Sequence, residues 1–447
     1  MMRSPQGGLR QSLEIARKRG AVALAAILLT ACQPPNSSGP LNPQPVGDAW
    51  NMYRGDLARD GHPSSATLNP AAAARLKLAW RIHLDGAVDG TPAVARGLAI
   101  AASAGGTLAA VNASTGETVW VKHGLGAISS SPTIANDLVH VATLGGRVYA
   151  FGLAHGEMVW TWSGAGGSAA WASPVVYGGE VIVALASPYG DNPLVPGRLV
   201  ALDEETGSER WNVCVLPGCE SGDGVWSTPA IDDQGTAFVG VGNPGDGVLA
   251  FDAATGHRKW FANLYSDSGR DLDVGATPVL FNLYGREVVA QASDEGLFAV
   301  LDASNGAVLW SKELVSGSAV HGLIASPAYD GTSVYVGSAS PPPGVFALDP
   351  SNGNVKWRRD TGQPIYSAPA VTRGVVVFGT GAVFGDLGSG SIVALSSADG
   401  RVLWSYDTRS AVRSGPAVAG DLVVVGDFAG DVLAFRPGDL RVGLSSA

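Results

Sequence analysis

A ten-residue phrase that ends in tryptophan recurs through the chain and constrains the fold more than any other feature of the sequence. Each copy places Gly at its sixth position and Trp at its last. Such self-similarity is typical of architectures in which one small unit of secondary structure is copied along the chain. The seven copies are VNASTGETVW (111–120), FGLAHGEMVW (151–160), LDEETGSERW (202–211), FDAATGHRKW (251–260), LDASNGAVLW (301–310), LDPSNGNVKW (348–357) and LSSADGRVLW (395–404).

A small residue followed by Pro precedes each copy, and one further dipeptide follows the last copy. The last dipeptide has no Trp after it, whereas Trp80, in LKLAWRIHL, has no dipeptide before it. The economical interpretation is a ring in which the N-terminal strand completes the last unit. The eight dipeptides are Thr91-Pro92, Ser131-Pro132, Ser173-Pro174, Thr228-Pro229, Thr277-Pro278, Ser326-Pro327, Ala368-Pro369 and Gly415-Pro416.

The sequence therefore predicts an all-β fold over residues 76–437, an eight-bladed β-propeller of four-stranded antiparallel blades. Closure of the ring removes free sheet edges. The Gly of each phrase suits a tight hairpin, which needs a positive φ. The Trp that follows is expected to pack between neighbouring blades. Asn69-Pro70 predicts a short capped helix at the end of a leading segment, residues 47–75.

The repeat resembles the tryptophan-docking propeller of the pyrroloquinoline quinone (PQQ) dehydrogenases. The lipoprotein scaffold of the outer-membrane β-barrel assembly machinery shares the same repeat. The resemblance covers roughly Trp50 to Pro437 and implies the fold for both. It leaves open whether the chain is an enzyme or a binding protein, because one fold hosts unrelated functions.

The N-terminus is typical of an export signal. Basic residues precede an apolar run from Ala21 to Leu29, which is too short to span a bilayer. Leu29-Thr30-Ala31-Cys32 looks like a bacterial lipobox, so residues 1–31 are expected to be a signal peptide and Cys32 to be acylated. Residues 32–46 then form a flexible tether. We expect an exported lipoprotein anchored to a membrane of the cell envelope, with a C-terminal tail at 438–447.

The net charge limits the classes of partner, and the cysteines predict a disulfide. Without the first 32 residues, which hold five basic residues and one acidic residue, the chain carries 24 basic against 38 acidic residues. Such a surface repels phosphate backbones, so no nucleic-acid partner is expected. Cys214 and Cys219 are close in an exported chain and predict a disulfide. We expect a monomeric propeller.

Long irregular loops predict the functional face. The turns within the repeated phrase are tight, whereas connections such as 187–198, 212–226 and 261–276 are long and all reach the other face. Binding sites are usually built on such loops when a rigid scaffold holds them. A partner or a cofactor is therefore expected at this face.

The resemblance to PQQ dehydrogenases implies particular residues at that face. Trp226 matches the aromatic that stacks on the quinone, and Asn243, after Gly242, matches a metal ligand. The base of the family lies in an acidic loop after the same blade, where this chain has Asp271 and Asp273. Asp271 matches better by position, and is also a candidate metal ligand. The implied cofactor is PQQ with Ca²⁺ or a lanthanide.

The chain also departs from the family. At the position of the Glu ligand it has Asp191 and Asn192, either of which can supply an oxygen. At the position of the cation it has Asp294, which reverses the charge beside the quinone. The paired adjacent cysteines of the alcohol dehydrogenases are absent, and so is a CxxCH haem motif.

Two functions follow from these observations. The first is a lipid-anchored binding or scaffold propeller that works through its long-loop face, with an envelope protein as a possible partner. The second is a PQQ- and metal-dependent alcohol or sugar dehydrogenase. Asp294 favours the binding protein, whereas Trp226 together with Asn243 favours the enzyme.

Overall fold

The computed structural model describes residues 50–63, 66–267, 269–382 and 388–438. The predicted signal peptide, Cys32 and the tether lie outside the described residues, as does the tail beyond residue 438. Within the described ranges, no helix has the length and apolar character needed to cross a membrane.

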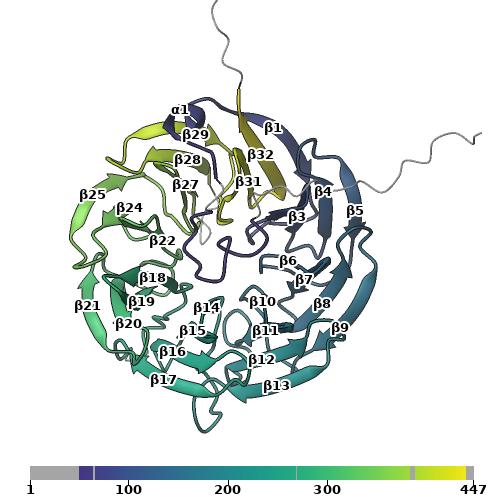
Figure 1. Ribbon diagram of the computed structural model, residues 1–447, viewed down its shortest axis with the longest axis vertical. Coiled ribbons are helices and arrows are strands. Elements are labelled where there is room, and N and C mark those ends of the chain that lie inside the picture. The colour runs from purple at the N-terminus through teal and green to yellow at the C-terminus, as the bar shows by residue number, and fades with distance from the viewer. Residues whose placement is uncertain (1–49, 64–65, 268, 383–387, 439–447) are drawn as a thin grey trace, which may run out of the picture. The chain divides into compact units, whose positions relative to one another are not determined.

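Eight four-stranded antiparallel sheets form a ring, which confirms the predicted fold (Figure 1). The strands of the first four blades, from the axis outward, are β2 (Ala93–Ala95), β3 (Leu98–Ala102), β4 (Leu108–Asn112), β5 (Thr118–Lys122); β6 (Thr133–Ala135), β7 (Leu138–Ala142), β8 (Arg147–Gly152), β9 (Met158–Ser163); β10 (Val175–Tyr177), β11 (Glu180–Leu185), β12 (Arg198–Asp203), β13 (Glu209–Cys214); and β14 (Ala230–Ile231), β15 (Thr236–Val241), β16 (Gly247–Asp252), β17 (Arg258–Asn263).

The other four blades repeat this order. Their strands are β18 (Val279–Leu283), β19 (Arg286–Ala292), β20 (Leu297–Asp302), β21 (Val308–Glu313); β22 (Ala328–Tyr329), β23 (Val334–Ser338), β24 (Gly344–Leu348), β25 (Val355–Asp360); β26 (Ala370–Thr372), β27 (Val375–Gly379), β28 (Ser391–Ser396), β29 (Val402–Asp407); and β30 (Ala417–Ala419), β31 (Leu422–Gly426), β32 (Asp431–Pro437), β1 (Leu76–His83).

The N-terminal strand closes the ring, as the repeat count predicts. β1 pairs antiparallel with β32, from Leu76 opposite Pro437 to His83 opposite Asp431. Helix α1 (Pro70–Ala73) precedes β1, and the side chain of Asn69 caps it by accepting a hydrogen bond from the N–H of Ala72 at 3.0 Å. The last blade therefore consists of three strands from the C-terminal end of the chain and one from near its start.

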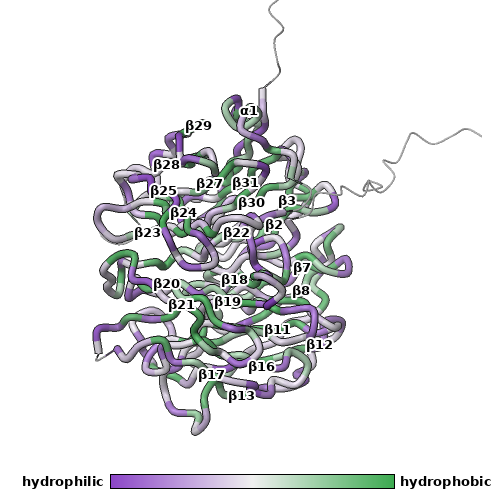
Figure 2. The backbone as a smooth tube through the Cα atoms, turned by 60° about the vertical axis from the view of Figure 1, so that its left-hand side comes forward, coloured by the Kyte–Doolittle hydropathy of each residue, from purple (hydrophilic) through white to green (hydrophobic). Residues whose placement is uncertain are grey.

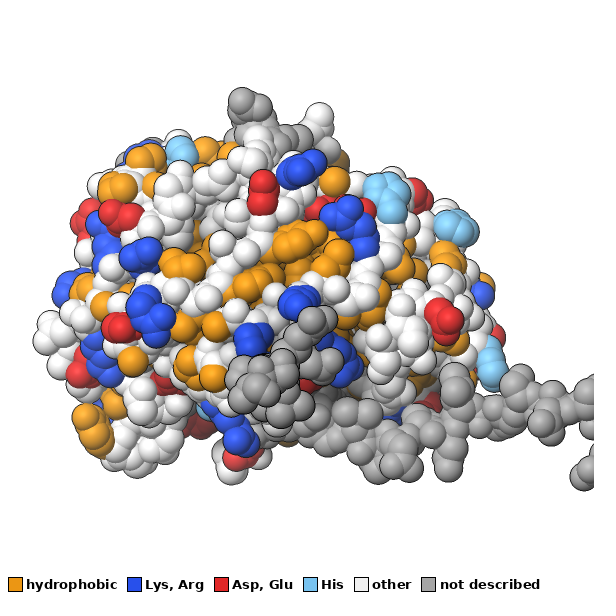
Figure 3. Space-filling model, turned by 90° about the horizontal axis from the view of Figure 1, so that it is seen from above, with side chains coloured by type: hydrophobic (Ala, Val, Ile, Leu, Met, Phe, Trp, Pro, Cys, Tyr) orange, Lys and Arg blue, Asp and Glu red, His pale blue; other side chains and the backbone are white. Residues whose placement is uncertain are grey.

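The core lies between the blades. Inner strands such as β15 are buried at every position, whereas outer strands such as β25 are largely exposed. Figure 2 shows hydrophobic residues along the strands and hydrophilic ones mostly in the turns. Some apolar side chains remain at the rim, and Figure 3 shows hydrophobic groups among Lys and Arg on the side of the molecule that carries α1. Leu78 and Val402 on outer strands are examples of such exposed side chains.

Seven of the eight blade tryptophans dock on the Gly of the next blade, and Trp404 packs against Phe435 instead. Gly116 has φ +76°, and a Cβ there would lie 2.8 Å from the ring of Trp80. The Nε1–H of Trp80 donates to the carbonyl of Ala113 at 3.0 Å. A side chain at this Gly is therefore excluded both by backbone conformation and by the Trp. The same pairing joins Trp120 to Gly156, Trp160 to Gly207, Trp211 to Gly256, Trp260 to Gly306, Trp310 to Gly353 and Trp357 to Gly400.

The predicted disulfide is present. Cys214, at the end of β13, bonds Cys219, and their Cα atoms are 5.3 Å apart. The bond closes a short turn in one of the long loops. In the chain-entropy model such a loop contributes about 2 kcal/mol to stability.

Residues 50–63, which we call the axial segment, run along the inner strands of the ring (Figure 1). Trp50 pairs with Val94 through two backbone hydrogen bonds of 2.7 and 2.8 Å. Further along, backbone carbonyls of the segment accept hydrogen bonds from innermost strands of successive blades. The acceptor and donor pairs are Asn51 with Ile134, Leu57 with Ile231, Ala58 with Leu280, Asp60 with Tyr329 and Gly61 with Val371. The segment thus ties six blades together at the axis.

Candidate functional site

The small residues of the eight dipeptides surround the axis, and we call them the small-residue ring. Six consecutive members are linked by five hydrogen bonds, each from a backbone N–H to the hydroxyl of the next blade. The bonds are Thr91 to Ser131 at 2.8 Å, Ser131 to Ser173 at 2.9 Å, Ser173 to Thr228 at 3.0 Å, Thr228 to Thr277 at 2.8 Å and Thr277 to Ser326 at 2.9 Å. The series stops at Ala368 and Gly415, which have no hydroxyl.

A second ring lies next to the first, and we call it the variable ring. Its members stand two positions before each small residue in the sequence. Unlike the small residues, they differ greatly in size and charge, which is typical of a binding surface on a regular scaffold. The eight members are Asp89, Ser129, Trp171, Trp226, Gly275, Ile324, Tyr366 and Arg413.

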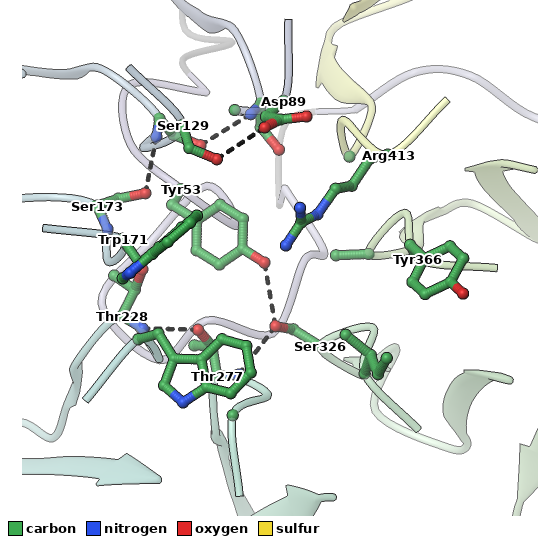
Figure 4. Close-up of a pocket in the computed structure, with 18 of the residues that line it drawn as sticks. Tyr53, Asp89, Ser129, Trp171, Ser173, Thr228, Thr277, Ser326, Tyr366 and Arg413 are labelled. Atoms are coloured by element: carbon green, nitrogen blue, oxygen red, sulfur yellow. Dashed lines mark hydrogen bonds between the residues drawn. The ribbon is translucent and has the colours of Figure 1, made fainter. Parts of the chain in front are cut away.

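The two rings line one axial cavity of about 120 Å³ (Figure 4). Tyr53 of the axial segment and Asp294 also line it. The hydroxyl groups of Tyr53 and Ser326 are hydrogen-bonded at 3.0 Å. The cavity has room for several water molecules or a small ligand. It is the place where the axial segment, the blade starts and the long loops meet.

Two tryptophans form aromatic walls of the cavity. The ring of Trp226 rests on Gly275 of the next blade, where a Cβ would lie 3.0 Å from its Cε2 atom. Glycine at this position therefore makes space for the indole. Trp171 donates its Nε1–H to the carbonyl of Ser187 at 2.9 Å, which fixes the position of its ring. Both side chains remain partly exposed and can contact a ligand.

Asp294 is a buried carboxylate at the cavity wall. The residue is 1% exposed, and its Oδ1 atom has no hydrogen-bond partner. Burial raises its pKa well above the usual range, and the nearby charges of Asp273 and Asp271 raise it further. Its backbone N–H donates to the carbonyl of Asp273 at 3.0 Å. This bond connects the cavity wall to the acidic loop.

Asp273 and Asn243 lie directly behind that wall. The backbone N–H of Asn243 donates to Oδ1 of Asp273 at 2.7 Å. A Cβ at Gly242 would lie 2.5 Å from the same oxygen, so Gly is needed for this approach. Burial raises the pKa of Asp273 to about 7. Asp271, by contrast, is exposed, which makes Asp273 the better candidate for a base of the two.

The remaining predicted residues lie farther from the cavity. Asp191 and Asn192 are exposed and do not line it, although the charge of Asp191 contributes to the raised pKa of Asp273. The side chain of Asn243 hydrogen-bonds Asp267; burial opposes ionisation of Asp267, but the backbone N–H groups of Arg270 and Leu272, together with Asn243, lower its pKa. The structure thus places Trp226 and Asp294 at the cavity and Asp271 and Asp273 near Asp294, whereas Asp191 and Asn192 do not line the cavity.

Sequence reasoning missed most of the lining residues, among them four that are large or charged. Tyr53, Asp89, Trp171 and Arg413 all face the cavity in Figure 4. Three of them belong to the variable ring, so their positions two residues before the small residue were a signal that could have found them. Arg413 is the most consequential, because it supplies the cation that was sought at Asp294 on a different blade.

The comparisons with known proteins agree with this architecture. The family model described as outer membrane protein assembly factor BamB matches residues 71–274, 195–321 and 294–442. The chain belongs to this family of PQQ-like propellers. Its similarity to a solved BamB from Moraxella catarrhalis has a TM-score of 0.64 at 19% identity, over 81% of this chain and 99% of that one.

Dehydrogenases share the same family fold. The quinohemoprotein alcohol dehydrogenase from Comamonas testosteroni superposes with a TM-score of 0.77 at 20% identity, over 90% of this chain and 82% of that one. A polyvinylalcohol dehydrogenase from Sphingopyxis sp. (strain 113P3) is 28% identical over 215 residues, 36% of this chain. The match spans only 33% of that relative's own length.

The cavity can be tested for its fit to PQQ, a planar quinone that carries several carboxylates. Trp226 offers a flat surface and Arg413 a cation. Asp89 and Asp294, however, would oppose the carboxylates of the quinone. No three His, Cys, Asp or Glu side chains in the described ranges come together to hold a metal ion. Trp226 and Arg413 thus suit PQQ, whereas Asp89 and Asp294 oppose it.

Proposed function

We propose that this protein is a cell-envelope propeller that binds a small ligand in its axial cavity and acts as a binding or scaffold protein through its long-loop face. One observation carries the proposal: the variable ring is chemically diverse, although the repeat keeps the neighbouring ring small. Diversity confined to the lining of a cavity is what ligand recognition requires.

The site of action belongs to the same proposal. The basic residues, the apolar run and the lipobox-like Leu29-Thr30-Ala31-Cys32 support export and acylation at Cys32. Two or more acyl chains would hold the propeller on a membrane. Mass spectrometry of the mature N-terminus tests this part, and cleavage at any other residue would contradict it.

Ligand binding is tested by tryptophan fluorescence, because two tryptophans line the cavity. We expect small polar ligands to change the fluorescence of the wild type more than that of Trp226→Ala, in which Trp171 alone remains at the cavity. Trp162→Ala serves as the control, since Trp162 lies on outer strand β9 and does not line the cavity. Equal responses in all three proteins would contradict binding at the axial cavity.

A PQQ- and metal-dependent dehydrogenase is the second candidate function. It is favoured by Trp226 and by Asp273, whose raised pKa suits a base working near neutral pH. The similarity to dehydrogenases supports it as well. The test is dye-linked oxidation of alcohols and sugars with added PQQ and Ca²⁺ or La³⁺. Turnover that is lost in Asp273→Asn and kept in Asp271→Asn would establish this function.

A further inference from the structure

Two carboxyl groups at the axial cavity each have an oxygen without a hydrogen-bond donor. Oδ1 of Asp294 is buried without a partner. Oδ1 of Asp89 has none either, whereas its Oδ2 accepts a hydrogen bond from Ser129 at 2.8 Å. A buried charge without a partner is costly, and a bound group with N–H or O–H donors would remove that cost.

The charges around the cavity favour a positive occupant. Asp271 and Asp273 lie behind Asp294 and add negative charge on that wall. Arg413 is the counter-charge that acts on Asp294, and it forms no ion pair among the described residues. Figure 4 shows its guanidinium directed into the cavity, on the side of Asp89. One arginine thus faces two lining carboxylates across the open space.

The aromatic walls indicate an organic cation. Trp171 and Trp226 both line the cavity, and an ammonium group is attracted to the face of an indole ring. A hard metal ion prefers six or more oxygen ligands. The described residues contain no cluster of three carboxylates, histidines or cysteines for one.

We propose that the axial cavity binds a small hydroxylated amine in its ammonium form, with the ammonium group at Asp294 and a hydroxyl oxygen accepting from Arg413. The inference rests on the proposed ligand-binding function and names its ligand class. The two opposite charges orient the ligand, because Arg413 repels the cationic end. The hydroxyl group can also donate to Oδ1 of Asp89.

Binding of this cation is expected to strengthen as the pH rises. Burial of Asp294 raises its pKa most, the charges of Asp273 and Asp271 raise it further, and Arg413 opposes them, so the pKa stays well above its usual value. An ammonium ion favours the ionised carboxylate, so binding releases a proton from Asp294. Affinity therefore falls as the pH is lowered, provided that the amine itself stays protonated.

The test uses three compounds of similar shape: serinol, glycerol and glycerate, which carry an ammonium, a hydroxyl and a carboxylate group. Binding to the full chain is measured by calorimetry and tryptophan fluorescence at pH 7.5. We expect serinol to bind about tenfold or more tighter than glycerol, the effect of one charge-assisted hydrogen bond. Glycerate is expected to bind weakest.

The outcomes separate this inference from the function on which it rests. If glycerol binds as well as serinol, or glycerate binds best, the ammonium assignment is wrong and small-ligand binding stands. If none of the three binds, the inference falls. If the fluorescence test with Trp226→Ala also gives no specific response, ligand binding at the cavity falls with it.

Single substitutions test which carboxyl group binds the ammonium group of serinol. Asp294→Asn keeps the shape of the side chain and should reduce serinol affinity to that of glycerol. Asp89→Asn is a second test with a smaller expected loss. Asp427→Asn is the matched control: Asp427 is also fully buried with an unpartnered oxygen, but it does not line the cavity. An equal loss in Asp427→Asn would show that the effect is structural.

Discussion

Buried ionisable side chains at the two ends of the propeller axis differ in the hydrogen bonds that they form. At one end, Arg54 and Arg59 of the axial segment are 1% and 0% exposed. Arg54 donates to the carbonyls of Pro327 and Pro369, and Arg59 donates to that of Pro229 at 2.9 Å. These prolines belong to the repeated dipeptides, so the arginines bind the repeat itself. Their charges hold the ring together.

At the other end, Oδ1 of the buried Asp294 has no hydrogen-bond partner. Each arginine leaves one buried nitrogen unpaired, Nε of Arg54 and Nη2 of Arg59, but its other nitrogens donate to backbone carbonyls. No such bond to a described residue is formed by the side chain of Asp294, which lies at the cavity. The difference teaches that burial alone does not distinguish a structural charge from a functional one. What distinguishes Asp294 is that its unpartnered carboxyl group belongs to the wall of a cavity.

The largest effect is expected when an arginine of the axial segment is removed. Arg54→Ala should destabilise the protein by about 3–5 kcal/mol, because it breaks buried charge-assisted bonds to two blades. Arg96→Ala is the control, since Arg96 is largely exposed and pairs with exposed Asp137. Urea unfolding measures both. Equal, small losses would mean that the axial segment does not tie the blades.

The pH dependence of stability should come from both ends. Burial raises the pKa of Asp60, in the axial segment, and that of Asp273 to about 7. The folded state therefore holds these protons more tightly than the unfolded chain. Stability should fall between about pH 4 and pH 7, by about 1.4 kcal/mol per pH unit for each group. Unfolding of Asp60→Asn and Asp273→Asn across this range should show flatter profiles. An unchanged slope in either variant would contradict its assignment.

Removing the charge of Asp294 should have the opposite sign to removing an arginine. We expect Asp294→Asn to change stability little at low pH and to raise it by about 1 kcal/mol at alkaline pH, because the buried carboxyl group must ionise there whereas the amide stays neutral. Thermal unfolding checks this. A marked loss of stability would place Asp294 among the structural charges and end the contrast between the two ends.

The smallest effect is expected in the small-residue ring between the two ends. Ala368→Ser adds a hydroxyl that can accept from the N–H of Ser326 and extend the hydrogen-bonded series, for a gain of about 0.5–1 kcal/mol. Ser131→Ala removes the acceptor of the Thr91 N–H and should cost about 1–2 kcal/mol. If neither variant changes stability, the hydrogen bonds of the small-residue ring do not contribute to the free energy of unfolding.

The fold could be predicted because the constraints repeat. The same contact between a Trp and a phrase Gly occurs at seven blade junctions. The fold can therefore be predicted from the repeat as a whole, even where a single copy is misinterpreted. Trp80 without a dipeptide, and Gly415-Pro416 without a Trp, were enough to predict the closing strand.

The candidate site could be predicted only in part, because its residues occur once each. Trp226 and Asp294 were found through a resemblance to one family. Arg413 was not, because the search for a cation followed that family's loop, and nothing local in the sequence marks an arginine as facing an axis. Its position becomes visible only when the same place is compared in all eight blades.

The closing pair of strands also sets the order in which this molecule can be completed. A ribosome makes β1 first among the strands and β32 last, so the partner of β1 does not exist until nearly the whole propeller has been synthesised. During that time the edge of β1 is unpaired, and it can bind an exposed strand of another chain or a chaperone. The final pairing joins distant parts of the chain, which makes it slow by its topology. The seam at the last blade is therefore where misassembly of this protein would begin.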